Sequence, residues 1–240
     1  MKINSYHVTE LIRENKLYSE YQPLLNSSND CIYGYEALMR STPRISPLTI
    51  LRHARKSGVL YELDTASMKN AIREYPNSYL RQHYLFINVL PSTLVHADFE
   101  KFINRLFECY PHVKNRIVFE LNEDWNEEFI WSQEIFLRRI EFLRSLGLRI
   151  AFDDLSITRA SIKKMDTISP DFVKLDHTRS KGLSQSQEKQ QLVSYLLQYT
   201  NNDMKLVLEG IETEDDLHTA KNIGVPLLQG YHISKPKRLI

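Results

Sequence analysis

Oxygen-bearing side chains stand at the ends of several short apolar runs in this sequence. Each run is followed directly by a carboxylate or an amide, and the residues concerned are Asn88, Glu120, Asp153, Asp154, Glu209 and Gln229. If the runs are strands of a parallel barrel, their carboxyl ends form one ring and these side chains converge on one site. Carboxylates that face one cavity repel each other unless cations lie between them. The spacing therefore predicts a metal-dependent enzyme.

The doublet Asp153-Asp154 is the sharpest local signal, and it has two interpretations. Adjacent residues of a strand point to opposite faces, so both carboxylates reach one site only where the strand ends. Taken alone, an acidic doublet is more typical of the cap of a following helix. Glu120 and Glu209 end neighbouring strands in the same way, and this repetition favours the metal site.

Lys174 and Asn88 also have two interpretations each. Lys174 lies between apolar neighbours in a predicted strand, where a lysine usually marks an edge or a solvent-facing position. In a barrel the same position can face the opening, where an ammonium among carboxylates could hold a nucleophilic water or neutralise a phosphate. Asn88 is either a turn former or a neutral oxygen ligand suited to Mg²⁺ or Mn²⁺.

Length, charge and cysteine content narrow the function classes. The chain has 240 residues, enough for one barrel-sized domain over residues 1–240. A formal net charge of +1 predicts that neither a nucleic-acid polymer nor a membrane surface is a partner. Two widely separated cysteines, Cys31 and Cys109, indicate a reduced, cytoplasmic location. The sequence has no HExxH, GxSxG or P-loop, which argues against zinc, serine-hydrolase and nucleoside-triphosphatase chemistry.

Apolar runs alternate with amphipathic segments from residue 84 onward, which is typical of a parallel sheet covered on both faces. Strands are expected at 84–89, 116–121, 148–152, 171–175, 205–208 and 226–228. Helices are expected at 91–109, 126–146, 187–199 and 213–223, with a polar connection between the strands at 148–152 and 171–175. Thr213, with Asp216 three residues on, resembles a capping arrangement at the start of the last helix.

The first third of the chain is less regular. Strands are expected at 17–25 and 31–39, joined by a turn too short for a crossover, so this pair should be an antiparallel hairpin. Two helices follow, at 47–57 and 61–75. Eight strands and no glycine-rich dinucleotide turn predict an α/β fold of the closed βα-barrel type rather than an open doubly wound sheet.

The tripeptide Glu36-Ala37-Leu38 follows Tyr21-Gln22-Pro23, and six further blocks come after it in order, from Phe86-Ile87-Asn88-Val89 to Gln229-Gly230-Tyr231, which leads to Ser234-Lys235-Pro236. Together these seven ordered blocks resemble the EAL family of cyclic di-GMP phosphodiesterases. The likeness covers residues 8 to 236, which indicates a stand-alone EAL domain. The resemblance implies a TIM-like (β/α)8 barrel with an irregular, antiparallel first strand. It also implies hydrolysis of cyclic di-GMP to linear pGpG by a two-metal mechanism.

The resemblance also implies a role for individual residues. The family's ligands for two Mg²⁺ or Mn²⁺ ions correspond to Glu36, Asn88, Glu120, Asp153, Asp154 and Glu209. Lys174 corresponds to the catalytic lysine, Gln229 to an amide that helps to hold the reactive water, and Glu36 is placed with them in the catalytic group. Gln22 and Arg40 correspond to substrate-binding positions, and Glu123 and Glu212 to residues that support the loop after the aspartate doublet. Family habit further implies a homodimer in the bacterial cytoplasm, in signalling that governs motility and biofilm.

The loop after Asp154 departs from the family pattern, because Ser156 and Thr158 stand where the family has glycines. Glycine adopts positive φ angles that serine and threonine adopt only at a cost, so the loop must follow another path or be looser. Two functions therefore stay open. The chain is an active phosphodiesterase, or it is a weak or inactive regulator that binds cyclic di-GMP or a protein partner without hydrolysis.

Overall fold

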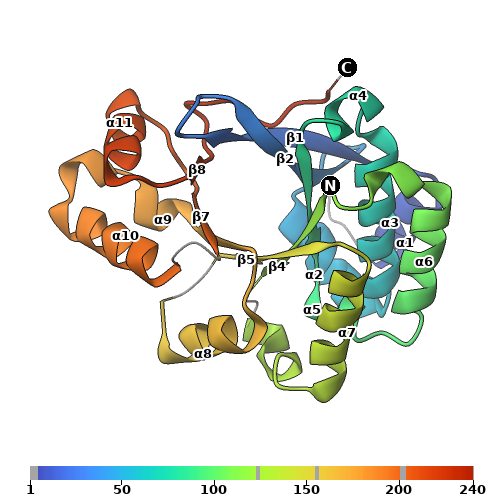
Figure 1. Ribbon diagram of the computed structural model, residues 1–240. Coiled ribbons are helices and arrows are strands. Elements are labelled where there is room, and N and C mark those ends of the chain that lie inside the picture. Colours follow the sequence, from blue (N-terminus) through green and yellow to red (C-terminus); the bar gives the residue numbers. More distant parts are fainter. Residues whose placement is uncertain (1–4, 123–124, 155–156, 201–203, 240) are drawn as a thin grey trace.

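The apolar runs form eight strands that pair in chain order and close into a barrel (Figure 1). The computed structural model describes residues 5–122, 125–154, 157–200 and 204–239. The strands are β1 (Leu17–Asn26), β2 (Ile32–Ser41), β3 (Tyr84–Val89), β4 (Ile117–Asn122), β5 (Arg149–Asp153), β6 (Phe172–Leu175), β7 (Lys205–Leu208) and β8 (Leu227–Leu228). β1 runs antiparallel to both of its neighbours, and all other neighbouring pairs are parallel. The predicted fold class and the antiparallel hairpin are confirmed.

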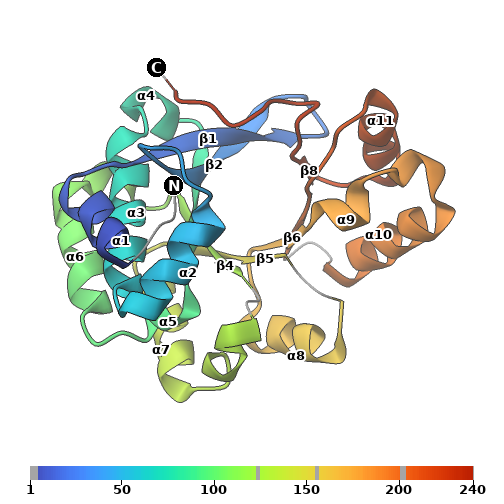
Figure 2. The same ribbon diagram turned by 180° about the vertical axis from the view of Figure 1, so that it is seen from behind.

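Helices lie around the outside of the ring of strands (Figures 1 and 2). They are α1 (Ser5–Arg13), α2 (Pro47–Ser57), α3 (Leu60–Glu74), α4 (Asn77–Leu80), α5 (Pro91–Leu94), α6 (Phe99–Cys109), α7 (Glu134–Ser145), α8 (Arg159–Ile168), α9 (His177–Ser180), α10 (Gln187–Thr200) and α11 (Glu214–Ile223). Short 3-10 segments are η1 (Pro111–Val113), η2 (Trp125–Ile130) and η3 (Leu183–Gln185). Within the described ranges, no helix has the length and apolarity that crossing a membrane requires.

Three expectations for the helices need correction. The helix expected at 91–109 is two helices, because the chain turns at His96, whose ring nitrogen accepts a hydrogen bond from the Asp98 amide at 3.2 Å. The helix expected at 126–146 is the 3-10 segment η2 followed by α7. The connection expected to be only polar contains α8, which buries a narrow stripe of Ser161, Met165 and Ile168.

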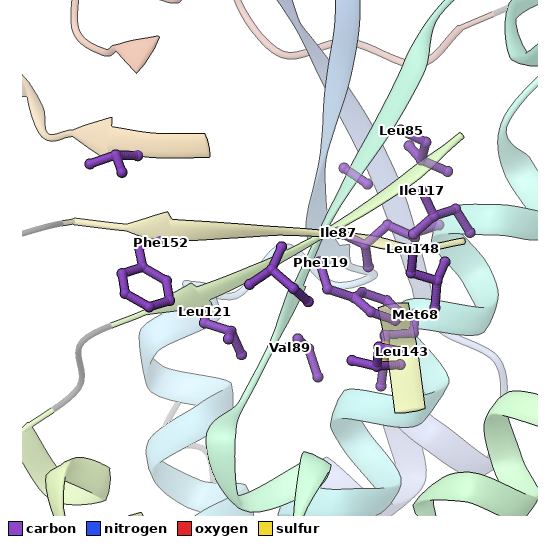
Figure 3. Close-up of a cluster of buried hydrophobic side chains, with 14 of the residues drawn as sticks. Met68, Leu85, Ile87, Val89, Ile117, Phe119, Leu121, Leu143, Leu148 and Phe152 are labelled. Carbon is purple, nitrogen blue, oxygen red and sulfur yellow. The ribbon is translucent and has the colours of Figure 1, made fainter. Parts of the chain in front are cut away.

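The main core lies between the outer face of the barrel and the helices. Alternate residues of β3, β4 and β5 point outward, and they pack against α3 and α7 (Figure 3). The side chains concerned are Leu85, Ile87, Val89, Ile117, Phe119, Leu121 and Phe152, which lie with Met68 and Leu143. The residues between them therefore point into the barrel, where the site is built.

Candidate active site

The inside of the barrel consists of an apolar plug with a polar layer one pleat above it. The plug is a separate cluster of buried side chains: Leu24, Phe86, Val118, Ala151, Phe172, Val207 and Leu227. Side chains two residues apart on a strand point to the same face. One pleat further toward the carboxyl ends of the parallel strands, the inward positions are therefore Asn88, Glu120, Asp153, Lys174, Glu209 and Gln229. On the antiparallel β1 the equivalent step runs backward, from Leu24 to Gln22.

Lys174 lies at the centre of this polar layer and is fully buried. Its Nζ lies 2.6 Å from Glu209 Oε1, 2.8 Å from Glu120 Oε1, 3.1 Å from Asp153 Oδ1 and 3.3 Å from Glu36 Oε2. The four carboxylates come from four different strands or strand ends, so the closed barrel brings them together. The interpretation of Lys174 as an edge or solvent-facing residue is wrong, because its strand is paired on both sides.

One ammonium does not balance four carboxylates, and the pKa values reflect this. Burial raises the pKa of Glu120 well above its ordinary value, and it raises the pKa of Asp153 to about 6 and that of Glu209 to about 8. Burial alone would lower the pKa of Lys174, but the surrounding carboxylates outweigh it and raise that pKa. Burial also opposes ionisation of Glu36, yet Lys174 and the amides of Gln229 and Asn88 lower its pKa. The site therefore favours bound positive charge.

Two amides connect the carboxylates. Gln229 Nε2 donates to Glu36 Oε2 at 2.8 Å, and Asn88 Nδ2 donates to Glu36 Oε1 at 3.2 Å and to Glu120 Oε2 at 3.3 Å. Asn88 pairs with Glu120 in the register of β3 and β4, which places the two side chains next to each other. The amides hold Glu36 in a fixed orientation toward the centre.

The residues present fit a divalent cation. Glu120 Oε1 and Asp153 Oδ1 are buried, and their polar partner among the described residues is the Lys174 ammonium alone. The buried Gln229 Oε1 has no hydrogen-bond partner in the described part of the chain. Buried polar atoms are normally paired, with water or an ion where no protein donor is present. Ligand oxygens of Asp153, Asp154 and Glu209 all lie within 4.8 Å of one another. A donor set of carboxylate and amide oxygens suits Mg²⁺ or Mn²⁺.

The aspartate doublet does not cap the helix that follows it. Asp154 is exposed, has a left-handed backbone with φ 53°, and accepts a hydrogen bond from Asn122 Nδ2 at 2.7 Å. The cap of α8 is Thr158, whose side chain accepts from the Ser161 amide at 3.1 Å. Thr158 is extended, with φ −121°, so its position requires no glycine. Ser156 lies outside the described residues.

Two cavities flank the carboxylates and meet at Glu36 and Leu38. The first, which we call the polar lobe, has a volume of about 390 Å³ and is lined by Gln22, Glu36, Leu38, His177, Glu209, Gly210, Glu212, Gln229, Gly230 and Tyr231. The second, the apolar lobe, has a volume of about 640 Å³ and extends from the site to helix α2. Leucines and other apolar residues form most of its walls. The charged residues that also line it include Arg40, Arg52, Arg55 and Asp64.

The remaining predicted residues lie around these lobes. Gln22 lines the polar lobe, and its Nε2 donates to the Ser234 carbonyl at 3.2 Å. Glu212 lines the same lobe and pairs with Lys181 at 3.3 Å. Arg40 lines the apolar lobe and forms an ion pair with Glu20 at 2.7 Å. Glu123 lies outside the described residues.

Sequence reasoning missed two polar residues near the site. Asn122 lines the apolar lobe, and its side-chain amide donates a hydrogen bond to Asp154. Its position at the end of β4, two residues after Glu120, was the feature of the sequence that could have revealed it. Asp64 also lines the apolar lobe, where its buried carboxylate accepts from the Leu90 amide at 2.9 Å. An aspartate on the apolar face of a helix was the available signal for Asp64.

The fold and the site together define a βα-barrel protein with an acidic centre suited to divalent cations. Residues 7–236 match the EAL domain model, and the chain belongs to the EAL domain family. It is 29% identical over 243 residues to the probable cyclic di-GMP phosphodiesterase PdeI of Escherichia coli K12, covering 97% of this chain and 30% of PdeI. The chain thus spans less than a third of the length of that relative.

Two solved structures show the same fold. An EAL domain protein from Listeria monocytogenes EGD-e superposes with a TM-score of 0.83 at 20% identity, covering 99% of this chain and 95% of the other. Klebsiella pneumoniae BlrP1, in a calcium and cyclic di-GMP complex, superposes with a TM-score of 0.82 at 24% identity, covering 92% of this chain and 56% of BlrP1. At these identities the likeness establishes the barrel architecture with its EAL-type first strand.

Proposed function

We propose that this domain hydrolyses one phosphodiester bond of cyclic di-GMP to give linear pGpG, with Mg²⁺ or Mn²⁺ as cofactor. The observation that carries the proposal is the ring of four carboxylates around Lys174, three of them buried and the fourth, that of Glu209, half-buried, at the point where two cavities meet. Membership of a family that includes cyclic di-GMP phosphodiesterases supports the choice of substrate.

The cations would be held by Glu36, Asn88, Glu120, Asp153, Asp154 and Glu209. When bound, they supply Lewis-acid activation of water and offset charge on the phosphoryl oxygens. The chain's own residues then position the reactants. Gln229 fixes Glu36 and offers its free amide oxygen to the attacking water.

Lys174 has a separate role in the proposed reaction. The carboxylates around it raise its pKa, so the side chain is an ammonium that donates hydrogen bonds rather than a base. We assign it to orienting the attacking water and to stabilising negative charge that develops at the phosphate. The carboxylates hold the ammonium from several sides, so it is already in place before substrate binds.

The shape of the site supports the proposal that its ligand is a cyclic dinucleotide. Such a ligand has a phosphate between two bases, and here an acidic centre lies between two lobes that share only Glu36 and Leu38. BlrP1, which has the same fold, holds cyclic di-GMP together with a metal ion. One base would enter each lobe while the scissile phosphate lies over Glu36 and Lys174.

The test measures pGpG formation from cyclic di-GMP with Mg²⁺, with Mn²⁺ and with EDTA. We expect product only with a metal ion, and loss of about a hundredfold or more of the rate in Glu120→Gln, which removes a ligand charge without changing shape. Glu36→Ala is the second loss-of-function control. Glu128→Ala, an exposed glutamate outside both lobes, should keep the wild-type rate.

A second candidate function is binding of cyclic di-GMP, or of a protein partner, without hydrolysis. The substitution of Ser156 for a glycine of the family favours it, because Ser156 belongs to the loop that directly follows a proposed metal ligand. Binding of cyclic di-GMP by a protein that yields no pGpG with either metal would establish this second function and exclude the first.

A further inference from the structure

One face of helix α2 forms the outer wall of the apolar lobe. Pro47, Leu48, Leu51, Arg52 and Arg55 all line the cavity. Their spacing of about three to four residues places them on the same side of an α-helix. The lobe therefore presents leucines and arginines to whatever enters it.

The arginines of this lobe differ in their partners. Arg40 is held by Glu20 at 2.7 Å and also donates to the Met39 carbonyl at 3.0 Å. Arg55 pairs with the buried Glu127 at 2.8 Å. Arg52 is exposed, and no residue in the described part of the chain forms an ion pair or a hydrogen bond with its guanidinium. Arg52 is thus free to bind a ligand without first breaking an internal contact.

The walls next to Arg52 suit a flat, largely apolar group. Leu51, Leu63, Val89 and Leu90 line the lobe, and Leu48 at its rim is 78% exposed. A large apolar side chain so exposed at the edge of a cavity gains most when a ligand covers it. A purine base has the flat faces that such walls accept and a polar edge for the guanidinium.

We propose that Arg52 recognises the O6 and N7 edge of the guanine that occupies the apolar lobe, and that it sets the preference for guanine over adenine. The inference rests on the proposed function, because it takes cyclic di-GMP as the ligand. Two parallel N–H groups of arginine match the two acceptors of this guanine edge. Adenine presents an amino group in place of O6, so one donor of Arg52 would face another donor. Arg52 is a specificity-determining residue and takes no part in the chemical step.

The experiment measures the dissociation constants of cyclic di-GMP and cyclic di-AMP in Ca²⁺, the ion in the BlrP1 complex. Wild type, Arg52→Ala and Arg52→Gln are compared with Lys56→Ala, which removes a charge from the same helix outside the lobe. We expect Arg52→Ala to weaken cyclic di-GMP binding about ten- to a hundredfold and to change cyclic di-AMP binding much less. Lys56→Ala should match wild type for both ligands.

Each other outcome overturns the inference. Equal loss for both dinucleotides would mean that Arg52 contacts a phosphate or ribose rather than the base edge. No loss for either, or the same loss in Lys56→Ala, would mean that Arg52 makes no contact. If wild type binds neither dinucleotide, the proposed function fails, and the role of Arg52 fails with it. Equal thermal unfolding midpoints of all variants exclude misfolding as the cause.

Discussion

Lys174 offsets part of the negative charge of the centre and fills the space between its carboxylates. Its Nζ contacts Glu36, Glu120, Asp153 and Glu209. Removing one partner of a buried ion pair leaves the other charge uncompensated and typically costs about 3–5 kcal/mol of stability. A bound divalent cation can supply the same compensation to these carboxylates.

Lys174→Met is therefore expected to lower the free energy of unfolding by roughly 3–5 kcal/mol in EDTA, and by much less in saturating Mn²⁺. Thermal unfolding in both conditions checks this, with Lys101→Met on the exposed face of α6 as the control. An equal loss of stability with and without Mn²⁺ would show that the carboxylates around Lys174 do not hold the ion. The variant should also lose turnover in the pGpG assay.

Asp64 is a buried acid outside the acidic centre, and its raised pKa predicts a pH effect on stability. Burial raises this pKa from 3.8 to about 6 in the folded protein, although the Leu90 amide opposes the shift. A raised folded-state pKa means that folding favours the protonated acid. The stability from this group is fully present below pH 3.8 and is lost as the pH rises through about 6.

Asp64→Asn should remove this pH dependence, because the amide keeps an oxygen for the Leu90 N–H and does not ionise. The wild-type free energy of unfolding should fall relative to the variant by roughly 2–3 kcal/mol between pH 4 and pH 7, at about 1.4 kcal/mol per pKa unit. Urea unfolding at several pH values measures the difference. Parallel curves for the two proteins would contradict a raised pKa at Asp64.

At the scale of elements, most strands from β3 onward were predictable because they carry an apolar run that ends in an oxygen-bearing residue. β3 and β7 have the predicted bounds, and the polar layer lies one pleat above the apolar plug. The inward direction of Lys174 could not be fixed from sequence, since it depends on which face of β6 meets the barrel interior. The lobes could not be predicted either, because α2 contributes to the site only after the barrel closes.

Two features of the helices could not be predicted from the sequence pattern: the break between α5 and α6, and helix α8. His96 lies in the break between α5 and α6, and its ring stacks on that of Tyr61 with ring centroids 3.7 Å apart. That contact joins residues far apart in sequence, so local pattern does not reveal it. Helix α8 escaped prediction because only a narrow stripe of it is buried.

The loop after β8 packs closely against the backbone of Ile211, and this contact can be tested at Gly230. A Cβ on Gly230 would lie 2.1 Å from the Ile211 carbonyl oxygen and 2.3 Å from the Ile211 amide nitrogen. Backbone atoms of a neighbouring segment cannot move aside cheaply. Gly58, at the end of α2, has a positive φ of 68°, but a Cβ added there would meet no atom within 4 Å.

Gly230→Ala should therefore destabilise the protein by roughly 3 kcal/mol or more and should displace the adjacent Gln229. Gly58→Ala should cost only about 1 kcal/mol, the strain of a left-handed alanine, and should leave ligand binding intact. Urea unfolding and cyclic di-GMP binding distinguish the two effects. Similar losses in both variants would show that the contact with Ile211 relaxes easily.

At the scale of the whole molecule, the barrel closes along a short seam. β8 pairs at only two positions with each of its neighbours, β1 and β7, and β5 and β6 also pair at two, whereas β3 and β4 pair at five. The C-terminal segment reinforces the seam, because Lys237 and Tyr21 exchange backbone hydrogen bonds of 2.7 and 3.1 Å (Figure 2). Site residues lie on both sides of it, since Gln229 follows β8 and donates to Glu36 on β2 at 2.8 Å.

Ligand binding should consequently stabilise the seam more than the rest of the barrel. Without ligand, amides of β8 and of residues 20–26 should exchange hydrogen with solvent through local opening, and those of β4 only through global unfolding. Cyclic di-GMP with Ca²⁺ should slow exchange at the seam by at least about tenfold, because the proposed ligand contacts of Gln22, Glu36 and Gln229 would bridge it. Hydrogen exchange read by mass spectrometry measures both regions at once. If the amides of the seam and of β4 are equally protected from exchange before ligand is added, the seam does not open locally. The barrel would then open only by global unfolding.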